Sequence, residues 1–157
     1  MPLESALYYS DGIKGSNTKK GRQDSSVVIE FDHRVYSPLD SQRGSVSGSR
    51  VHAPLVITKE IDAATPLLYE ASCNGKTIPE FKVEWYRISP DGREEPYFQH
   101  TLKNVKVASV EIILPNTKDP SKEKQSHLER LELLYEQVTW TYLDGQLEHT
   151  DSWKEQM

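Results

Sequence analysis

The chain has 157 residues, of which 36% are hydrophobic and 27% charged, and its formal net charge is −5. With eight Tyr and three Trp it is too rich in core-forming residues to be disordered, and its length suits one domain, residues 1–157. The acidic balance, with no basic run longer than Lys19-Lys20, argues against nucleic-acid binding.

The N-terminal residues Met1 to Asp11 lack the basic and apolar regions of a signal peptide, and no segment approaches the ~20 apolar residues of a membrane span. We therefore expect the chain to fold in the cytoplasm. The single cysteine, Cys73, allows no intrachain disulfide, and we expect it to be a small buried hydrophobic residue.

The first half of the chain predicts two strands. Apolar residues alternate from Val27 to Phe31, which indicates a half-buried strand that continues toward Tyr36. A second alternating run extends from Val51 to Ile57, but Pro54 has no N–H to donate, so this strand is at an edge or irregular. The polar stretch between them, Ser37 to Ser49, exceeds ~12 residues, a length typical of functional or disordered loops.

A short helix follows. Thr65 is of a type that caps the first amides, and Pro66 suits the first helical position. The helix should then run to Cys73, where Asn74-Gly75 supplies a left-handed stop.

The next region predicts a hairpin and a bent strand. The alternating run 82–88 and the run from Pro96 flank a turn at Ser89-Pro90-Asp91-Gly92. The apolar phase then changes within residues 101–114, which predicts a bulge near Ala108-Ser109, as is common where a sheet bends to close.

The last region is partly ambiguous. Residues 128–135 fit either a strand or a helix, because the leucines satisfy both periods. Residues 138–142 are strand-like, and 143–146 form a turn. Together these elements predict many strands around one short helix, as a closed or nearly closed β-barrel or a sandwich.

No pattern predicts catalytic, cofactor-binding or metal-binding residues. The segment Gly44–Gly48 has Val46 where a nucleophile elbow needs Ser, and Gly12–Ser16 lacks the spacing of a phosphate loop. The five histidines contain no pair at the i, i+4 spacing of a helical zinc site, and we expect them to be surface or hydrogen-bonded groups: His33, His52, His100, His127 and His149. The aromatic residues are expected to pack in the core.

Several motifs in one order carry a family resemblance. Val51 to Asp62 ends in T-K-x-I-D, Pro66-Leu67-Leu68 begins a helix, and Glu84-Trp85-Tyr86-Arg87 and Tyr135 to Tyr142 (Y-x-x-V-x-W-x-Y) are strand motifs. With residues 96–98 and 101–107, they resemble the haemolysin-coregulated protein (Hcp) family, the inner-tube subunits of type VI secretion systems. The resemblance extends from about residue 26 to residue 153.

The resemblance implies a mainly β fold, a two-sheet β-barrel with one short flanking α-helix, and a structural, non-enzymatic role. It implies homo-hexameric rings that stack into a tube, with spike, baseplate and sheath components as partners and secreted effectors in the lumen. It also implies export to the outside or into target cells without a signal peptide, and a strand over 135–142. The opening strand matches poorly, although residues 6–9 could serve.

The resemblance assigns the loop 37–49 to contacts with the adjacent ring. Its candidate ring-stacking residues are Leu39, Asp40, Gln42 and Arg43, and we hypothesise that Asp40 and Arg43 form complementary contacts between rings. Neighbours within a ring would meet through strand edges on one side and the helix near 65–74 on the other.

Two other functions fit parts of the sequence. A lipocalin-like barrel that binds a small ligand suits the strand number and the aromatic residues. An enzyme on a β scaffold is disfavoured by the missing nucleophile, metal and phosphate patterns.

Overall fold

The computed structural model describes residues 2–46 and 48–153. Its strands are β1 (Ser5–Tyr9), β2 (Ser26–Asp32), β3 (Val35–Tyr36), β4 (Leu39–Asp40), β5 (Ser45–Val46), β6 (Val51–His52), β7 (Leu55–Glu60), β8 (Thr77–Ile88), β9 (Glu94–Ile113), β10 (Leu128–Leu134), β11 (Gln137–Tyr142) and β12 (Leu147–Ser152). The helix α1 spans Thr65–Cys73, and a 3₁₀ turn spans Pro120–Lys122.

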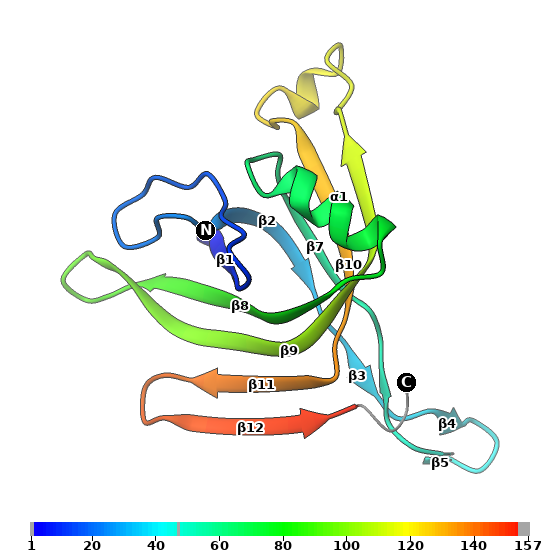
Figure 1. Ribbon diagram of the computed structural model, residues 1–157. Helices are drawn as coiled ribbons and strands as arrows, with labels where there is room; N and C mark the ends of the chain where they lie inside the picture. Colours follow the sequence, from blue (N-terminus) through cyan, green and yellow to red (C-terminus); the bar gives the residue numbers. More distant parts are fainter. Residues whose placement is uncertain (1, 47, 154–157) are drawn as a thin grey trace.

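Eight strands form one antiparallel sheet in the order β10-β7-β2-β1-β8-β9-β11-β12. Since β10 also pairs with β9, the six strands from β10 to β9 close on themselves, and β11 and β12 extend the sheet beyond β9 (Figure 1). The helix α1 contacts β9. The mainly β, barrel-like fold with one flanking helix is confirmed.

Strand β9 belongs to both parts of the sheet. Along one edge it pairs with β8 from Glu94 to Lys106. Along the other edge it pairs with β11 as far as Lys103 and with β10 from Lys106 onward. The change occurs at Asn104, whose φ of 53° turns the strand. Ala108 has no partner on β10, because Val107 pairs with Leu133 and Ser109 with Glu132, so the predicted bulge is confirmed.

The interior is filled by side chains from alternate positions of the ring strands. Fully buried members include Leu7, Leu55, Ile57, Phe81, Leu102 and Leu131. Each such side chain contributes about 1.5–3 kcal/mol by leaving water. The period of two found in the sequence therefore separates a core face from an outward face on most strands.

The helix ends at Cys73 as predicted, but it begins one residue earlier than expected, at Thr65 with Ala64 as the N-cap. The Thr65 hydroxyl accepts a hydrogen bond from the Asp62 N–H at 3.1 Å and caps no helix amide. Asp62 itself turns the chain, since its Oδ1 accepts from the Ala64 N–H at 3.0 Å. At the other end Gly75 has a φ of 62°, which confirms the left-handed stop.

The expectation that Cys73 is buried is wrong. Thr65, Leu68 and Ala71 form the buried side of α1, and Cys73 in the last turn is exposed. The spacing of three residues between the buried positions explains this, because the position two residues after Ala71 lies on the other side of a helix.

Three other predictions are settled by the strand pairings. Residues 128–134 form the strand β10, whose two edges pair with β7 and β9. Tyr135 lies between β10 and β11 and so outside the strand that the resemblance implied. Pro54 interrupts its run into β6 and β7, and the long loop 37–49 contains the short strands β4 and β5.

Candidate functional site

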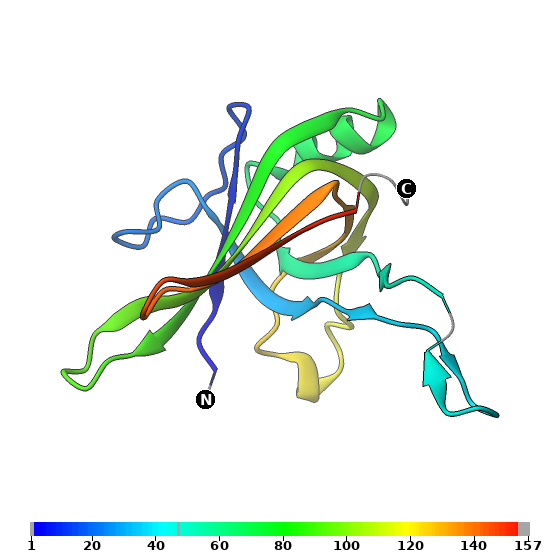
Figure 2. The ribbon, with the colours of Figure 1, turned by 90° about the horizontal axis from the view of Figure 1, so that it is seen from below.

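The most prominent surface feature is a two-part hairpin that leaves the barrel. Its stalk is the β3–β6 pair, with Val35 opposite His52 and Tyr36 opposite Val51, and its tip is the β4–β5 pair. Figure 2 shows this hairpin extending away from the sheets at the lower right. The candidate stacking residues therefore lie at the end of an arm.

The tip carries an apolar pair. Leu39 lies directly opposite Val46, and their exposed fractions are 74% and 60%. Asp40 shapes the turn, because its Oδ1 accepts hydrogen bonds from the N–H groups of Gln42 (3.0 Å) and Arg43 (3.3 Å). The Arg43 guanidinium lies 3.8 Å from the Asp40 carboxylate of its own chain. Sequence reasoning named Leu39 but missed Val46, which strand pairing places beside it.

The base of the arm is held by one tyrosine. The Tyr135 hydroxyl lies 2.7 Å from Nε2 of His33 and 2.5 Å from Nδ1 of His52, so it bridges the chain entering the arm and the chain leaving it. His52 Nε2 in turn lies 2.7 Å from Asp151 of β12, which also accepts two hydrogen bonds from Arg50. The arm is thereby tied to the core and to the last strand.

One assignment of donors and acceptors is consistent with all three of these hydrogen bonds. Asp151 accepts from His52 Nε2, which leaves His52 Nδ1 to accept from Tyr135, whose oxygen accepts from His33 Nε2. Burial lowers the pKa of His33 to about 4, and the Arg50 hydrogen bonds lower the pKa of Asp151. Burial raises the pKa of the Tyr135 hydroxyl, so it is a structural donor rather than a nucleophile.

A third histidine lies next to this cluster. The ring of His100 is 5.4 Å from that of His33, and its Nδ1 accepts a hydrogen bond from Trp85 Nε1 at 3.0 Å. Burial lowers the pKa of His100 to about 3. The cluster was not predicted from sequence. The available signal was that His33 and His52 flank the long loop closely on its two sides.

A second buried polar group ties the barrel to the segment before the helix. The Lys59 ammonium is fully buried, 3.0 Å from Asp62 Oδ1 and 2.8 Å from Glu129 Oε1. The Glu129 contact lacks hydrogen-bond geometry, so the two groups are joined by charge alone. Ser26 accepts a hydrogen bond from Tyr9 and donates one to Asp62, and burial raises the pKa of Tyr9.

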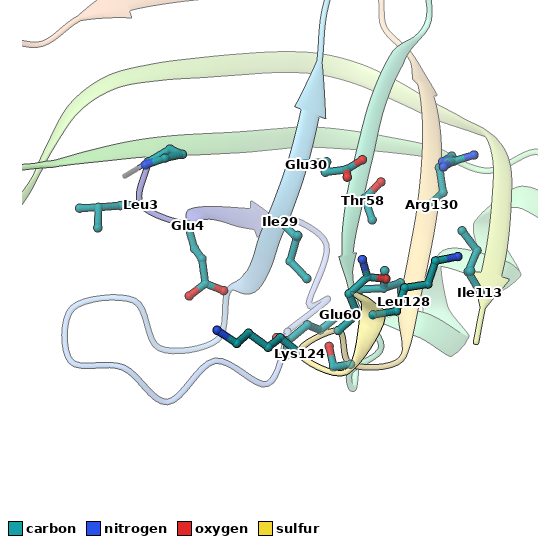
Figure 3. A pocket seen from close by; sticks show the side chains of 14 residues that line it. Leu3, Glu4, Ile29, Glu30, Thr58, Glu60, Ile113, Lys124, Leu128 and Arg130 are labelled. Carbon is teal, nitrogen blue, oxygen red and sulfur yellow. The ribbon is translucent and has the colours of Figure 1, made fainter. Parts of the chain in front are cut away.

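The outward face of β2, β7 and β10 is hollowed. A depression of about 540 Å³ is lined by residues of these strands, by the N-terminal residues and by residues 122–126 (Figure 3). An adjoining hollow of about 630 Å³ continues over Asp32, Val56 and Glu132. Glu30, Thr58 and Arg130 line both hollows, and Figure 3 shows them in a row across the three strands.

Within residues 2–46 and 48–153, no group of three or more His, Cys, Asp or Glu side chains is placed to hold a metal ion. No helix in that part of the chain has the length and apolarity needed to cross a membrane.

Comparison with known proteins identifies the fold and its family. The family described as "Type VI secretion system effector, Hcp" matches residues 8–142. The "Major exported protein" of Pseudomonas aeruginosa is 32% identical over 152 residues, which cover 97% of this chain and 88% of the relative.

Solved structures agree. A variant of Hcp1 from the E. coli EAEC 042 pathovar superposes with a TM-score of 0.84 at 38% identity, covering 98% of this chain and 99% of that one. A structure described as an Hcp protein gives a TM-score of 0.87 at 28% identity, covering 97% of both chains.

These matches decide between the functions considered from the sequence. They give no support to a lipocalin-like ligand-binding barrel, and the matched family is one of structural secretion proteins rather than enzymes. The chain belongs to the Hcp family of type VI secretion tube proteins.

Proposed function

We propose that this chain is the building block of a type VI secretion inner tube, in which six copies form a ring and rings stack end to end. In this role it is made in the cytoplasm and exported, and it works with spike, baseplate and sheath components. The name of its Pseudomonas relative, "Major exported protein", supports export. Effector proteins would travel inside the rings.

The observation that carries the proposal is the arm with its apolar tip. Leu39 and Val46 form an exposed apolar pair, and paired exposed residues of this size suit a protein contact. The Tyr135 bridge fixes the base of the arm, so little conformational freedom would be lost on docking. A second ring is the partner that we assign to this tip.

The charged tip residues have a secondary role in this proposal. Asp40 and Arg43 face each other within one hairpin, so a contact between rings would use them only after they exchange partners. Exposed charge pairs contribute about 0.2–1 kcal/mol each. Leu39 and Val46 therefore supply the main contact, and Gln42 and Arg43 border it.

Contacts within a ring need two different surfaces that meet head to tail. Strand β12 pairs only with β11 among the described strands, so its outer edge offers unpaired backbone groups. The exposed side of α1, which includes Leu67, offers the second surface. Six chains of formal charge −5 would carry −30, a repulsion that salt screens beyond ~8 Å.

The test is the native mass of the purified protein by light scattering, with negative-stain images of the same fraction. We expect a mass near six chains and annular particles, and short stacks at high protein concentration. A monomer at all concentrations would overturn the proposal.

Variants then separate stacking from ring formation. Leu39→Ser with Val46→Ser should abolish stacks and leave the ring mass unchanged. Ile88→Ser with Leu114→Ser is the matched control, since these residues are exposed by 62% and 63% but lie outside the arm. If rings of the Leu39→Ser, Val46→Ser variant still stack, the tip is not the stacking contact. If Arg43→Glu leaves stacking unchanged, Asp40 and Arg43 form no contact between rings.

A further inference from the structure

The outward face of β2, β7, β10 and the end of β9 has an uneven distribution of charge. Strand register places Glu30, Thr58, Arg130 and Glu111 in one row, and Asp32, Val56, Glu132 and Ser109 in the next. Glu60 lies on the same face beside Leu128. These positions thus hold five carboxylates and one guanidinium, and Lys106 follows on the same face opposite Leu134.

None of these charged groups forms an ion pair with another described residue. The ion pairs of the described chain all lie elsewhere: in the core, on the arm and at its base, on β8 and β9, and on the turns and loops. Of the two hollows, Lys122 and Lys124 border only the first, and Figure 3 shows Lys124 near Glu60. Grouping like charges on one sheet face destabilises the sheet, so a fold that keeps them there retains a capacity to bind cations.

A second observation points to a ligand at the same place. Thr58 is 4% exposed and lines both hollows, yet its hydroxyl makes no hydrogen bond to any described residue. Among the described residues only the Glu129 oxygens are both fully buried and without a hydrogen bond, so the unpaired Thr58 oxygen is open to the hollows that it lines. In Figure 3 the Thr58 side chain lies between those of Glu30 and Arg130. The site thus offers a free hydroxyl next to a free carboxylate.

We propose that this face, here called the acidic face, binds a Lys- or Arg-rich segment of a transported protein. A lysine ammonium has three donors, which suit the Glu30 carboxylate and the Thr58 hydroxyl together. Glu30 and Asp32 are separated by ~6.6 Å along β2, close to the spacing of alternate side chains in an extended peptide. Glu132 across the strands would hold the next cation.

The inference rests on the proposed function in one respect, because a ring would repeat the acidic face six times and bind a basic segment at several points. Multiple weak contacts give strong retention without a tight single site. Such contacts are also released by salt, which suits a cargo that must leave.

The test uses the purified full-length chain and a fluorescently labelled peptide of alternating Lys and Ser. Binding is measured by fluorescence anisotropy at low salt. Peptides of alternating Glu and Ser, and of Gln and Ser, are the charge controls. We expect only the Lys peptide to bind, and its binding to weaken as salt rises. Equal binding of all three peptides, or preference for the Glu peptide, would overturn the inference.

Variants locate the binding. The triple variant Glu30→Gln, Asp32→Asn and Glu132→Gln should lower the affinity for the Lys peptide roughly tenfold. Thr58→Val should lower it about three- to tenfold. Arg130→Gln should raise it about threefold by removing repulsion.

A matched triple variant has the same charge change on exposed turns: Asp24→Asn, Asp91→Asn and Asp144→Asn. Its affinity for the Lys peptide should stay within about twofold of that of the original chain if the contacts are local. An equal loss in both triple variants would mean that only net charge matters and would refute the acidic face.

The native mass of every sample separates this inference from the proposed function. Rings that do not bind the Lys peptide would refute the acidic face and leave the tube subunit standing. A monomer that binds it through the same residues would refute the tube subunit and leave the acidic face standing.

Discussion

Replacing the buried Lys59 should destabilise the chain more than replacing its partner Glu129. The Lys59 ammonium has two acidic partners, Asp62 and Glu129, and also donates to the Glu60 carbonyl at 3.0 Å. Glu129 has only Lys59. Loss of the cation should therefore cost more than loss of the anion, although both groups are fully buried.

The magnitudes follow from what each change leaves behind. Lys59→Met leaves the Glu129 carboxylate buried without a counter-charge, which costs about 3–5 kcal/mol. Glu129→Gln leaves Lys59 with Asp62 and the Glu60 carbonyl, so we expect a loss of about 1–2 kcal/mol.

The double variant completes the cycle. Lys59→Met with Glu129→Gln removes both charges, so its cost should fall close to that of Glu129→Gln alone rather than to the sum. Asp62 keeps its hydrogen bonds from Ser26 and the Ala64 N–H in all variants.

The assay is urea unfolding at pH 7, monitored by tryptophan fluorescence. It is run at two protein concentrations, because the stability of an oligomer depends on concentration. If Lys59→Met costs no more than Glu129→Gln, or if the two costs add in the double variant, the account of this ion cluster is refuted.

Three further predictions concern the fold and the base of the arm. The unfolded chain binds protons at His33 and His100 more readily than the folded chain, so the free energy of unfolding should fall as the pH drops from about 6.5 through about 4 and 3. The loss at pH 5 should be about 2 kcal/mol from His100 and less from the partly exposed His33. Thermal melts across this pH range would show it. Tyr135→Phe should cost about 1–3 kcal/mol and increase hydrogen exchange in the arm, since it leaves two imidazoles without their shared partner; unchanged exchange would contradict the bridge. Gly15→Ala should cost about 1–3 kcal/mol in urea unfolding, because its Cβ would lie 2.3 Å from the Ser25 carbonyl oxygen, and a neutral substitution would contradict this packing.

Much of the fold follows from local patterns, because alternation and turn residues act over short distances. The strand near 27–32, the hairpin around Ser89–Gly92 and the bulge at Ala108 all depend on neighbours in sequence. Residues 128–134 could not be assigned by pattern, since their leucines fit both periods. Pairing with β7 and β9, both distant in sequence, decides for a strand.

The candidate site was less accessible to sequence reasoning. The arm could be located from its length and composition, but its tip pair needs Val46 to be folded back onto Leu39. The Tyr135 bridge joins side chains about 100 and 80 residues apart, which no local pattern contains. The acidic face likewise arises only when register places Glu30 and Glu132 on one side of the sheet.

The closure of the ring by β10 also bears on how the chain is made. Strand β7 ends at Glu60 and finds its outer partner only when β10 begins at Leu128, about 70 residues later. At about 5–20 residues per second, a ribosome needs roughly 3–14 s for that interval. Throughout it β7 has a free hydrogen-bonding edge, and the end of β9 has one from its own synthesis until β10 pairs with it. Such edges are sites for pairing with other nascent chains. Synthesis should therefore be the stage at which this protein depends most on chaperones.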